Sequence, residues 1–141
     1  MASAFVKIDK FVLNLGKKVF DLSSDQIKVA LSNTAPTVAT ANQYSDITSP
    51  IAGTNLSGAT PFNVTTTSFL QTSGTAKLIL ADLTLTATGA VGPFRYVILY
   101  DDTATNDEII GYYDYASSVT LADGDTFIID FDASAGVLTL A

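Results

Sequence analysis

Carboxylates are the side chains best able to do chemistry in this sequence, because the chain contains neither histidine nor cysteine. It therefore lacks the commonest general base and every thiolate or imidazole metal ligand. Closely spaced acids in turns favour calcium. They occur here as Asp101, Asp102, Asp107 and Glu108, and as Asp123 and Asp125.

The spacing of the first acidic group does not match an EF-hand loop. Asn106 stands where the loop needs glycine, and Tyr112 stands where it needs glutamate. Asp123 and Asp125 flank Gly124, and Asp-Gly is a common turn sequence because both residues tolerate positive φ. We favour solvated turn acids over calcium ligands and expect no cofactor, with a bound calcium ion left as the alternative.

A second acidic pair suggests glycoside hydrolysis, which uses two carboxylates. Asp130 and Asp132 are two positions apart, so a strand would point both to one face. The same alternation places Phe127, Ile129 and Phe131 on the other face, which is the pattern of an ordinary core strand. Serine nucleophiles lack a histidine to activate them. We therefore predict that the protein is not an enzyme.

Residues suited to contact with other proteins are easier to find. The first 28 residues hold five lysines against three aspartates, whereas the remainder holds two basic residues against eleven acids. Adjacent Tyr112 and Tyr113 must point to opposite faces of a regular strand, so we expect at least one to meet solvent, a sugar or a partner. The interface candidates are Lys10, Lys17, Lys18, Tyr44, Ile47, Ile51, Leu56, Tyr112 and Tyr113.

The elements that position these residues begin with a predicted helix over residues 3–21. Apolar residues recur there at steps of three and four, with Ser3 as the expected N-cap. Its expected buried face consists of Phe5, Ile8, Phe11 or Val12, Leu15 and Val19. Period-two alternation predicts a strand over 26–32. Residues 33–61 are polar and rich in proline and glycine, which indicates a long loop or arm whose apolar residues either enter a neighbour or fold back.

Residues 62–141 alternate almost throughout and predict an antiparallel β body. Expected strands cover 62–71, 75–86 with a β-bulge at Ala81–Asp82, 94–100, 108–115, 126–132 and 136–140. Asp123–Gly124 predicts a hairpin. With the strand at 26–32 and a further short one near Val119, this gives about eight strands. We predict one all-β domain over residues 1–141, a β-sandwich or jelly roll with an N-terminal amphipathic helix.

Composition narrows the function further. The net charge is −7, so the acidic body repels phosphate backbones and we expect no nucleic-acid partner. No apolar run is long enough to cross a bilayer and the first residues lack the pattern of a secretory signal, so we expect no membrane partner and synthesis in the cytoplasm. Only 15% of the residues are charged, and such a surface suits permanent contact with neighbours.

Several sequence stretches resemble a family of small virion proteins from tailed phages. They are residues 92–104 (GPFRYVILYDDTA), 110–115 (IGYYDY), 117–121 (SSVTL), 130–132 (DFD) and 28–36 (KVALSNTAP). The likeness covers most of the chain and is loosest across residues 37–75. Tyr112 or Tyr113 stands where family members often carry tryptophan.

The resemblance is greatest to capsid cement or decoration proteins. It implies a protein on the outer capsid surface that bridges major capsid protein subunits, made in the host cytoplasm and assembled as a dimer or trimer. A tail or connector component is the second interpretation. A carbohydrate-binding attachment module that uses exposed tyrosines is the third.

Overall fold

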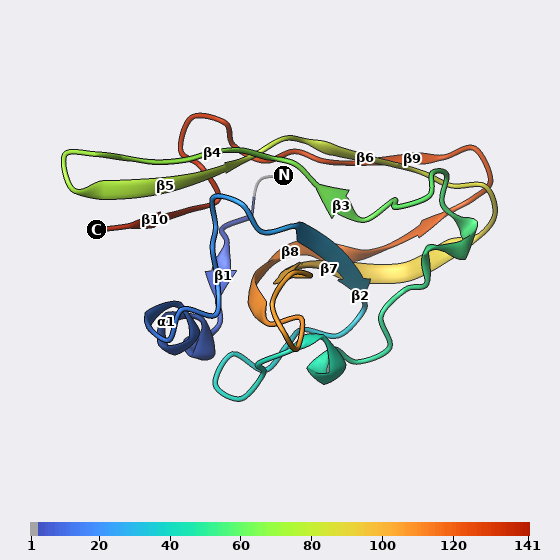
Figure 1. The fold of residues 1–141 in the computed structure, drawn as a ribbon. Coiled ribbons are helices and arrows are strands. Elements are labelled where there is room, and N and C mark those ends of the chain that lie inside the picture. Colours follow the sequence, from blue (N-terminus) through green and yellow to red (C-terminus); the bar gives the residue numbers. More distant parts are fainter. Residues whose placement is uncertain (1–2) are drawn as a thin grey trace.

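The computed structural model describes residues 3–141, in which ten strands form two facing β layers (Figure 1). The lower layer in Figure 1 is one antiparallel sheet with the order β1-β8-β7-β2-β3. Its strands are β1 (Val6–Lys7), β8 (Ile109–Leu121), β7 (Val91–Asp101), β2 (Ile27–Ser32) and β3 (Asn63–Val64). The chain is therefore an all-β, sandwich-like protein, as its alternating sequence predicts.

The upper layer consists of two smaller antiparallel sheets. One has the order β10-β5-β4 and the other pairs β6 with β9. The strands are β4 (Thr66–Thr72), β5 (Thr75–Leu80), β6 (Leu83–Thr86), β9 (Thr126–Ile129) and β10 (Leu138–Leu140). Ser73 and Gly74, both with positive φ, make the tight turn between β4 and β5.

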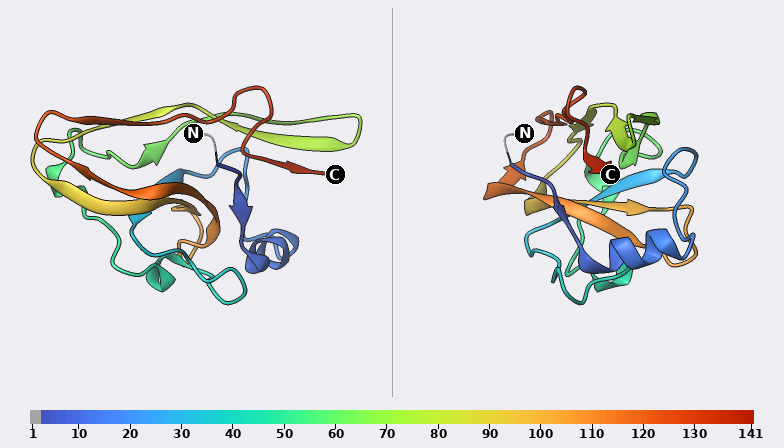
Figure 2. Two further views of the ribbon diagram at one scale, coloured as in Figure 1. Left: turned by 180° about the vertical axis from the view of Figure 1, so that it is seen from behind. Right: turned by 90° about the vertical axis from the view of Figure 1, so that its left-hand side faces the viewer.

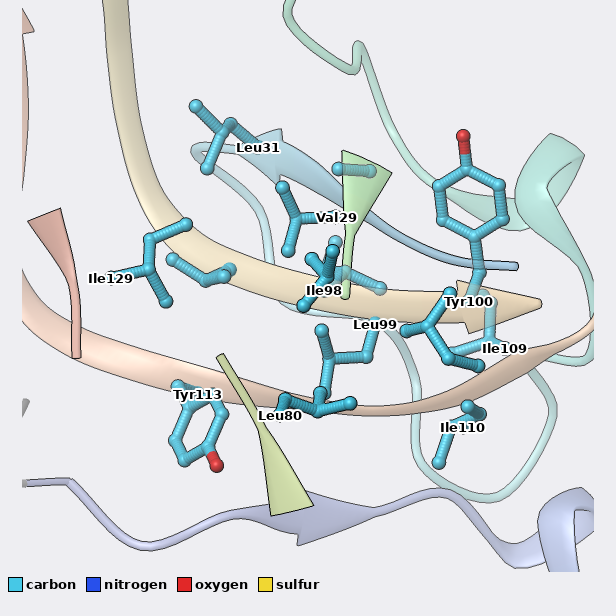
Figure 3. Packing of buried hydrophobic residues seen from close by; sticks show 14 of the residues in the cluster. Val29, Leu31, Leu80, Ile98, Leu99, Tyr100, Ile109, Ile110, Tyr113 and Ile129 are labelled. Atoms are coloured by element: carbon cyan, nitrogen blue, oxygen red, sulfur yellow. The ribbon is translucent and has the colours of Figure 1, made fainter. Parts of the chain in front are cut away.

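The main hydrophobic core lies between the two layers (Figure 3). Alternate residues of each strand point into it, so Val29 and Leu31 of β2 lie on the same face as Leu99 and Val97 of β7. Aromatic rings join the layers, because Phe94 of β7 packs edge-on against Phe127 of β9 with ring centroids 5.1 Å apart. The side chains at the centre are fully buried, as expected for a close-packed core.

The 33–61 segment covers the outer face of the lower sheet (Figure 2). It has no long element of its own, only the 3-10 turns η1 (Tyr44–Asp46) and η2 (Gly53–Asn55). It is held by backbone hydrogen bonds, including Ile51 N–H to the Leu31 carbonyl at 2.8 Å. Ala30 and Ser32 of β2 are consequently buried as well, so β2 is buried on both faces and not on one.

The helix expected over residues 3–21 is much shorter, because α1 spans only Asp9–Gly16. Residues 6–7 instead form β1, which pairs with β8 through Val6–Tyr112 and Lys7–Gly111. Ile8, and not Ser3, occupies the N-cap position, and the Val38 carbonyl accepts the Asp9 N–H at 3.0 Å. The extended conformation prevails here because Gly111 allows the first residues to lie close against β8.

Lys18 ends the helix in a left-handed conformation, with φ of 65°. Val19 N–H donates to the Asn14 carbonyl at 3.0 Å and Lys18 N–H donates to the Leu15 carbonyl at 3.1 Å. This is the Schellman arrangement, here with lysine in place of the usual glycine. The helix is anchored by the Phe11–Phe20 ring contact and by a hydrogen bond from Asn14 Nδ2 to Asn42 Oδ1 of 2.9 Å.

Several predicted strands have different bounds or partners. The strand expected over 75–86 does not continue through a bulge, because at Ala81–Asp82 the chain leaves one sheet and enters another. Asp82 Oδ1 there accepts the Phe131 N–H at 2.9 Å. The strand expected over 62–71 is likewise divided, into β3 and β4. Asp123–Gly124 does form a turn, but the turn is not a hairpin, since β9 pairs with β6 and not with β8.

Candidate functional site

The outward side of α1 combines basic and apolar side chains. Lys10 and Lys17 are exposed on or next to the helix, together with Lys18 and Lys7. None of these four lysines forms an ion pair with any of residues 3–141. We call Lys7, Lys10, Lys17, Lys18, Val12 and Leu13 the basic helix surface.

Val12 and Leu13 give this surface its apolar part. They are 56% and 50% exposed, whereas Phe11 and Asn14 of the same helix are buried against the body. The sequence left open whether Phe11 or Val12 faces inward, and the answer is Phe11. Unpaired lysines beside exposed aliphatic side chains suit a partner surface that is acidic and partly apolar.

The four interface candidates in the 33–61 segment turn inward instead. Ile47 and Leu56 are buried in the core, and Tyr44 and Ile51 pack against it half-buried. The Tyr44 ring lies 4.9 Å from that of Tyr100, and burial raises the pKa of both phenols. This segment therefore folds back on its own subunit, and these residues are unsuitable as direct contacts because the core already uses their apolar surface.

Tyr113, another interface candidate, is buried as well. Its ring is buried between Phe5, at 5.1 Å, and Phe131, at 6.1 Å, and burial raises its pKa to about 12. Tyr112 lies on the opposite face, as expected, where it is half-buried against Tyr96. The exposed tyrosine of this strand is Tyr115.

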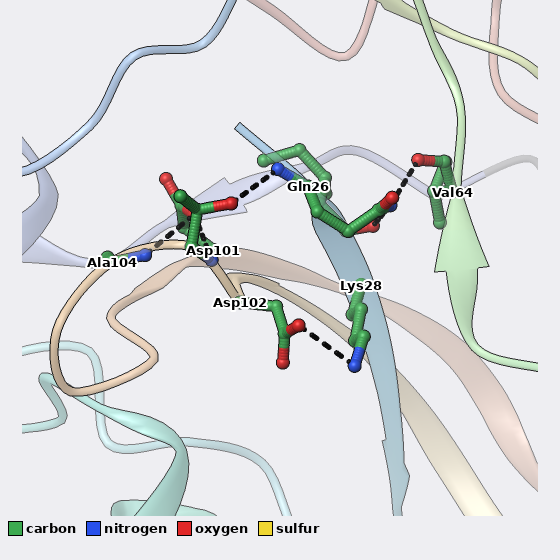
Figure 4. Close-up of polar contacts among 8 residues, drawn as sticks. Gln26, Lys28, Val64, Asp101, Asp102 and Ala104 are labelled. Carbon is green, nitrogen blue, oxygen red and sulfur yellow. Dashed lines mark hydrogen bonds and ion pairs between the residues drawn. The ribbon is translucent and has the colours of Figure 1, made fainter. Parts of the chain in front are cut away.

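The acidic loop after β7 uses its carboxylates to shape itself (Figure 4). Asp101 Oδ1 accepts the N–H groups of Thr103 at 2.9 Å and Ala104 at 3.1 Å. Glu108 likewise accepts from the backbone and side chain of Asn106. Asp102 forms an ion pair of 2.9 Å with Lys28.

The second acidic turn does the same, since Asp125 Oδ2 accepts the Ala122 N–H at 2.9 Å. No group of three or more acidic side chains arranged to hold a metal ion occurs in residues 3–141. The acids shape their turns, but Asp101 and Glu108 are buried, so the expectation that all of them are solvated is wrong for these two.

Asp101 also takes part in a contact that the sequence did not indicate. It is completely buried, and Asp25, in the turn before β2, is the neighbouring acid that acts on it. No N–H or O–H group of the described chain donates to Asp101 Oδ2. Burial, and then the contact with Asp25, raises the pKa of Asp101 to about 7.

Asp25 lines an open hollow of about 590 Å³ beside the end of α1, together with Lys18, Asp21 and Glu108. Asp25 and Asp101 are far apart in the chain, and neither residue stands in a motif. No local signal could have paired them.

Asp130 and Asp132 lie beyond the end of β9 and not on a regular strand. Asp132 Oδ1 accepts the N–H groups of Ser134 and Ala135, both at 2.8 Å, and these bonds lower its pKa. Asp132 therefore stabilises the turn before β10, which accounts for its place in the sequence without catalysis.

Comparison with protein-family models, curated proteins and solved structures finds no match to this chain. None of the helices within residues 3–141 has the length and apolar character needed to span a membrane. The functional argument therefore depends on the surfaces described above.

Proposed function

We propose that this chain is a capsid cement protein of a tailed phage, which binds the outer capsid surface and bridges major capsid protein subunits. The basic helix surface is the observation that carries the proposal. It combines four exposed lysines that form no ion pair within residues 3–141 with two exposed aliphatic side chains, and Asp9 is the one acid of the same helix, in a protein whose net charge is −7. The resemblance of the sequence to small virion proteins supports the same function.

The proposed mechanism is passive adhesion. Lys10, Lys17 and Lys18 attract an acidic patch on the capsid, and Val12 and Leu13 lose water against it. Burial of apolar surface contributes about 25 cal/mol per Å², so many copies together would strengthen a shell against the pressure of packaged DNA. The two-layered β body supplies a rigid support on which the helix is held by Phe11 and Asn14.

Charge reversal tests this proposal directly. The double variant Lys17→Glu/Lys18→Glu should bind to capsids that lack the protein about tenfold more weakly than the unmodified protein, because rim charges steer association. Lys17→Arg/Lys18→Arg is the matched control and should bind normally, with the same loss of binding as salt rises. Equal occupancy of capsids by all three proteins would rule out the basic helix surface as the part of the protein that binds the capsid.

Location in the particle tests the wider proposal. A cryo-EM map of virions should show the protein on the capsid shell, at positions where several major capsid protein subunits meet. Density at the tail or connector would favour the second interpretation given by the sequence. Assembly on symmetric sites also predicts a dimer or trimer, made in the host cytoplasm before it reaches the shell.

A further inference from the structure

Strand β4 is an open edge that carries neither charge nor proline and is irregular only at its first residues. The sheet order β10-β5-β4 leaves its far side without a strand partner among residues 3–141. Edge strands are normally protected by charge, proline or a covering segment, since their free N–H and C=O groups otherwise pair with another chain. Thr66–Thr72 contains neither a charged residue nor proline.

The β4–β5 hairpin also projects from one end of the molecule, as Figures 1 and 2 show from different sides. Its outer face carries Leu70, which at 73% is the most exposed large apolar side chain in the described chain. Leu70 and Ile79, with Ser68, Thr72, Thr75 and Lys77, line a shallow hollow of about 400 Å³. An exposed leucine beside a free strand edge marks a place where another β strand fits.

The distribution of charge along the chain indicates which protein would supply the strand that pairs with β4. The chain has no charged residue between Asp46 and Lys77, although the whole protein carries −7. Two copies repel each other at most orientations. This repulsion is weakest where both copies present the uncharged segment, whereas a strongly basic partner would gain no attraction from it. A second copy is therefore the occupant that the segment fits.

The strand geometry sets the register. Pairing of β4 with β5 is irregular between Thr66 and Ser68 and regular from Ser68 to Thr72. In an antiparallel pair related by a two-fold axis, directly opposite residues point to the same face of the sheet. The axis must therefore pass midway between the two copies of one residue, so that this residue lies opposite itself. The midpoint of the regular stretch is Leu70, so Leu70 would face its twin and Ser68 would face Thr72 of the other copy.

We propose that two copies of this chain pair through their β4 strands, antiparallel and two-fold symmetric about Leu70, to form one continuous sheet. Lys77 does not oppose this arrangement. It lies opposite Leu70 on β5, so it is separated from its twin by three strand spacings, or about 14 Å, which exceeds the Debye length in physiological salt. Its ammonium group is also held within its own subunit by the Ser134 carbonyl at 2.7 Å.

The test uses purified protein without capsids, so dimerisation and capsid binding can fail separately. At about 100 μM, sedimentation should show a dimer in the unmodified protein, since a small edge-to-edge contact is weak. Leu70→Glu should abolish the dimer by placing two like charges at the axis, whereas Ile128→Glu should not. Ile128 is the matched control because it is 57% exposed on β9. Circular dichroism should show that both variants stay folded.

Cross-linking gives a second readout, because the natural chain has no cysteine. Residues directly opposite in an antiparallel pair have Cα atoms about 4.5–5.5 Å apart, within disulfide range. Leu70→Cys should therefore form disulfide-linked dimers at least about tenfold faster than Ile128→Cys.

Three results would overturn the inference. One is a protein that stays monomeric at this concentration and whose Leu70→Cys variant links no faster than Ile128→Cys. Another is a dimer that Leu70→Glu leaves intact. The third is a monomer whose β4 amides become protected from hydrogen exchange only when capsids are added, which would assign the edge to the capsid instead.

Discussion

Asp101, the last residue of β7, is fully buried and its pKa is raised by burial and by Asp25, which lies in the turn before β2. Asp101 Oδ1 is fully used by the N–H groups of Thr103 and Ala104, so only Oδ2 is free to meet Asp25. Two ionised carboxylates cannot hydrogen-bond to each other. Burial disfavours the ionised form of Asp101, and the nearby Asp25 disfavours it further, so the raised pKa keeps a proton on Asp101 at a pH where free aspartate has lost it.

This pair predicts that the protein loses stability as pH rises from about 4 to about 7. The pKa of Asp101 is about 7 in the folded state and near 3.8 when unfolded, so the folded state binds the extra proton in that window. The stabilisation is complete below the unfolded pKa and lost as pH passes the folded pKa. Urea unfolding at pH 5 and pH 8 should reveal a difference on the order of 1–3 kcal/mol from this pair.

Asp101→Asn separates this effect from other titrations. An amide cannot lose the proton and can still donate to Asp25, so the variant should show a flatter pH dependence and match or exceed the natural protein at pH 8. Asp102→Asn is the neighbouring control, because Asp102 is exposed and pairs with Lys28. An unchanged pH profile in Asp101→Asn would refute the raised pKa of Asp101 as the cause of the pH dependence.

Asp114 should affect the pH dependence of stability in the opposite direction to Asp101, because its pKa is lowered and not raised. Arg95 donates from Nε to Asp114 Oδ1 at 2.7 Å and from Nη2 to Asp114 Oδ2 at 2.8 Å, and these bonds lower the pKa of Asp114 to about 2. The pair's stabilising effect should be present above the unfolded pKa and disappear as pH falls through the folded one. Carboxyl NMR titration should find the low pKa, and Arg95→Gln should return it towards the usual value for aspartate.

Gly111 should be the least replaceable glycine for the β1–β8 pairing. A Cβ at this position would lie 2.4 Å from the Val6 carbonyl oxygen and 2.5 Å from the Phe5 ring. Gly111→Ala should therefore lower the free energy of unfolding by about 1–3 kcal/mol. Gly16→Ala is the control, because nothing lies within 4 Å of the added carbon and the helix should gain about 0.5 kcal/mol. Thermal unfolding of both variants measures the contrast.

The folded-back position of the 33–61 segment predicts a stability effect from its apolar residues. Ile47 is buried, so Ile47→Ala should lower the free energy of unfolding by about 2–4 kcal/mol. Val12→Ala, on the exposed side of α1, should change it by less than about 0.5 kcal/mol. Equal effects of the two changes would show that the segment is an arm that leaves the body in solution.

Local residue patterns were enough to predict the fold class and most of the strands. Alternation at Phe127, Ile129 and Phe131 shows which side of that strand is buried, whereas at Ile27, Val29 and Leu31 it identifies the strand but not the burial of its second face. That information is local, since side chains of a strand alternate between faces whatever the strand pairs with. Ser73–Gly74 likewise determined its turn, because the turn needs positive φ at both residues.

The pairing of the strands, and the choice of apolar residues that remain exposed, depend on long-range packing. β9 pairs with β6 in spite of the turn that joins it to β8, and residues 6–7 became a strand because Gly111 made room for them. The same long-range packing buried Tyr113, Ile47 and Leu56, left Val12, Leu13 and Leu70 exposed, and brought Asp25 to Asp101. Such contacts join residues distant in the chain, and their energy depends on the shape of both surfaces, which no local pattern of residues records.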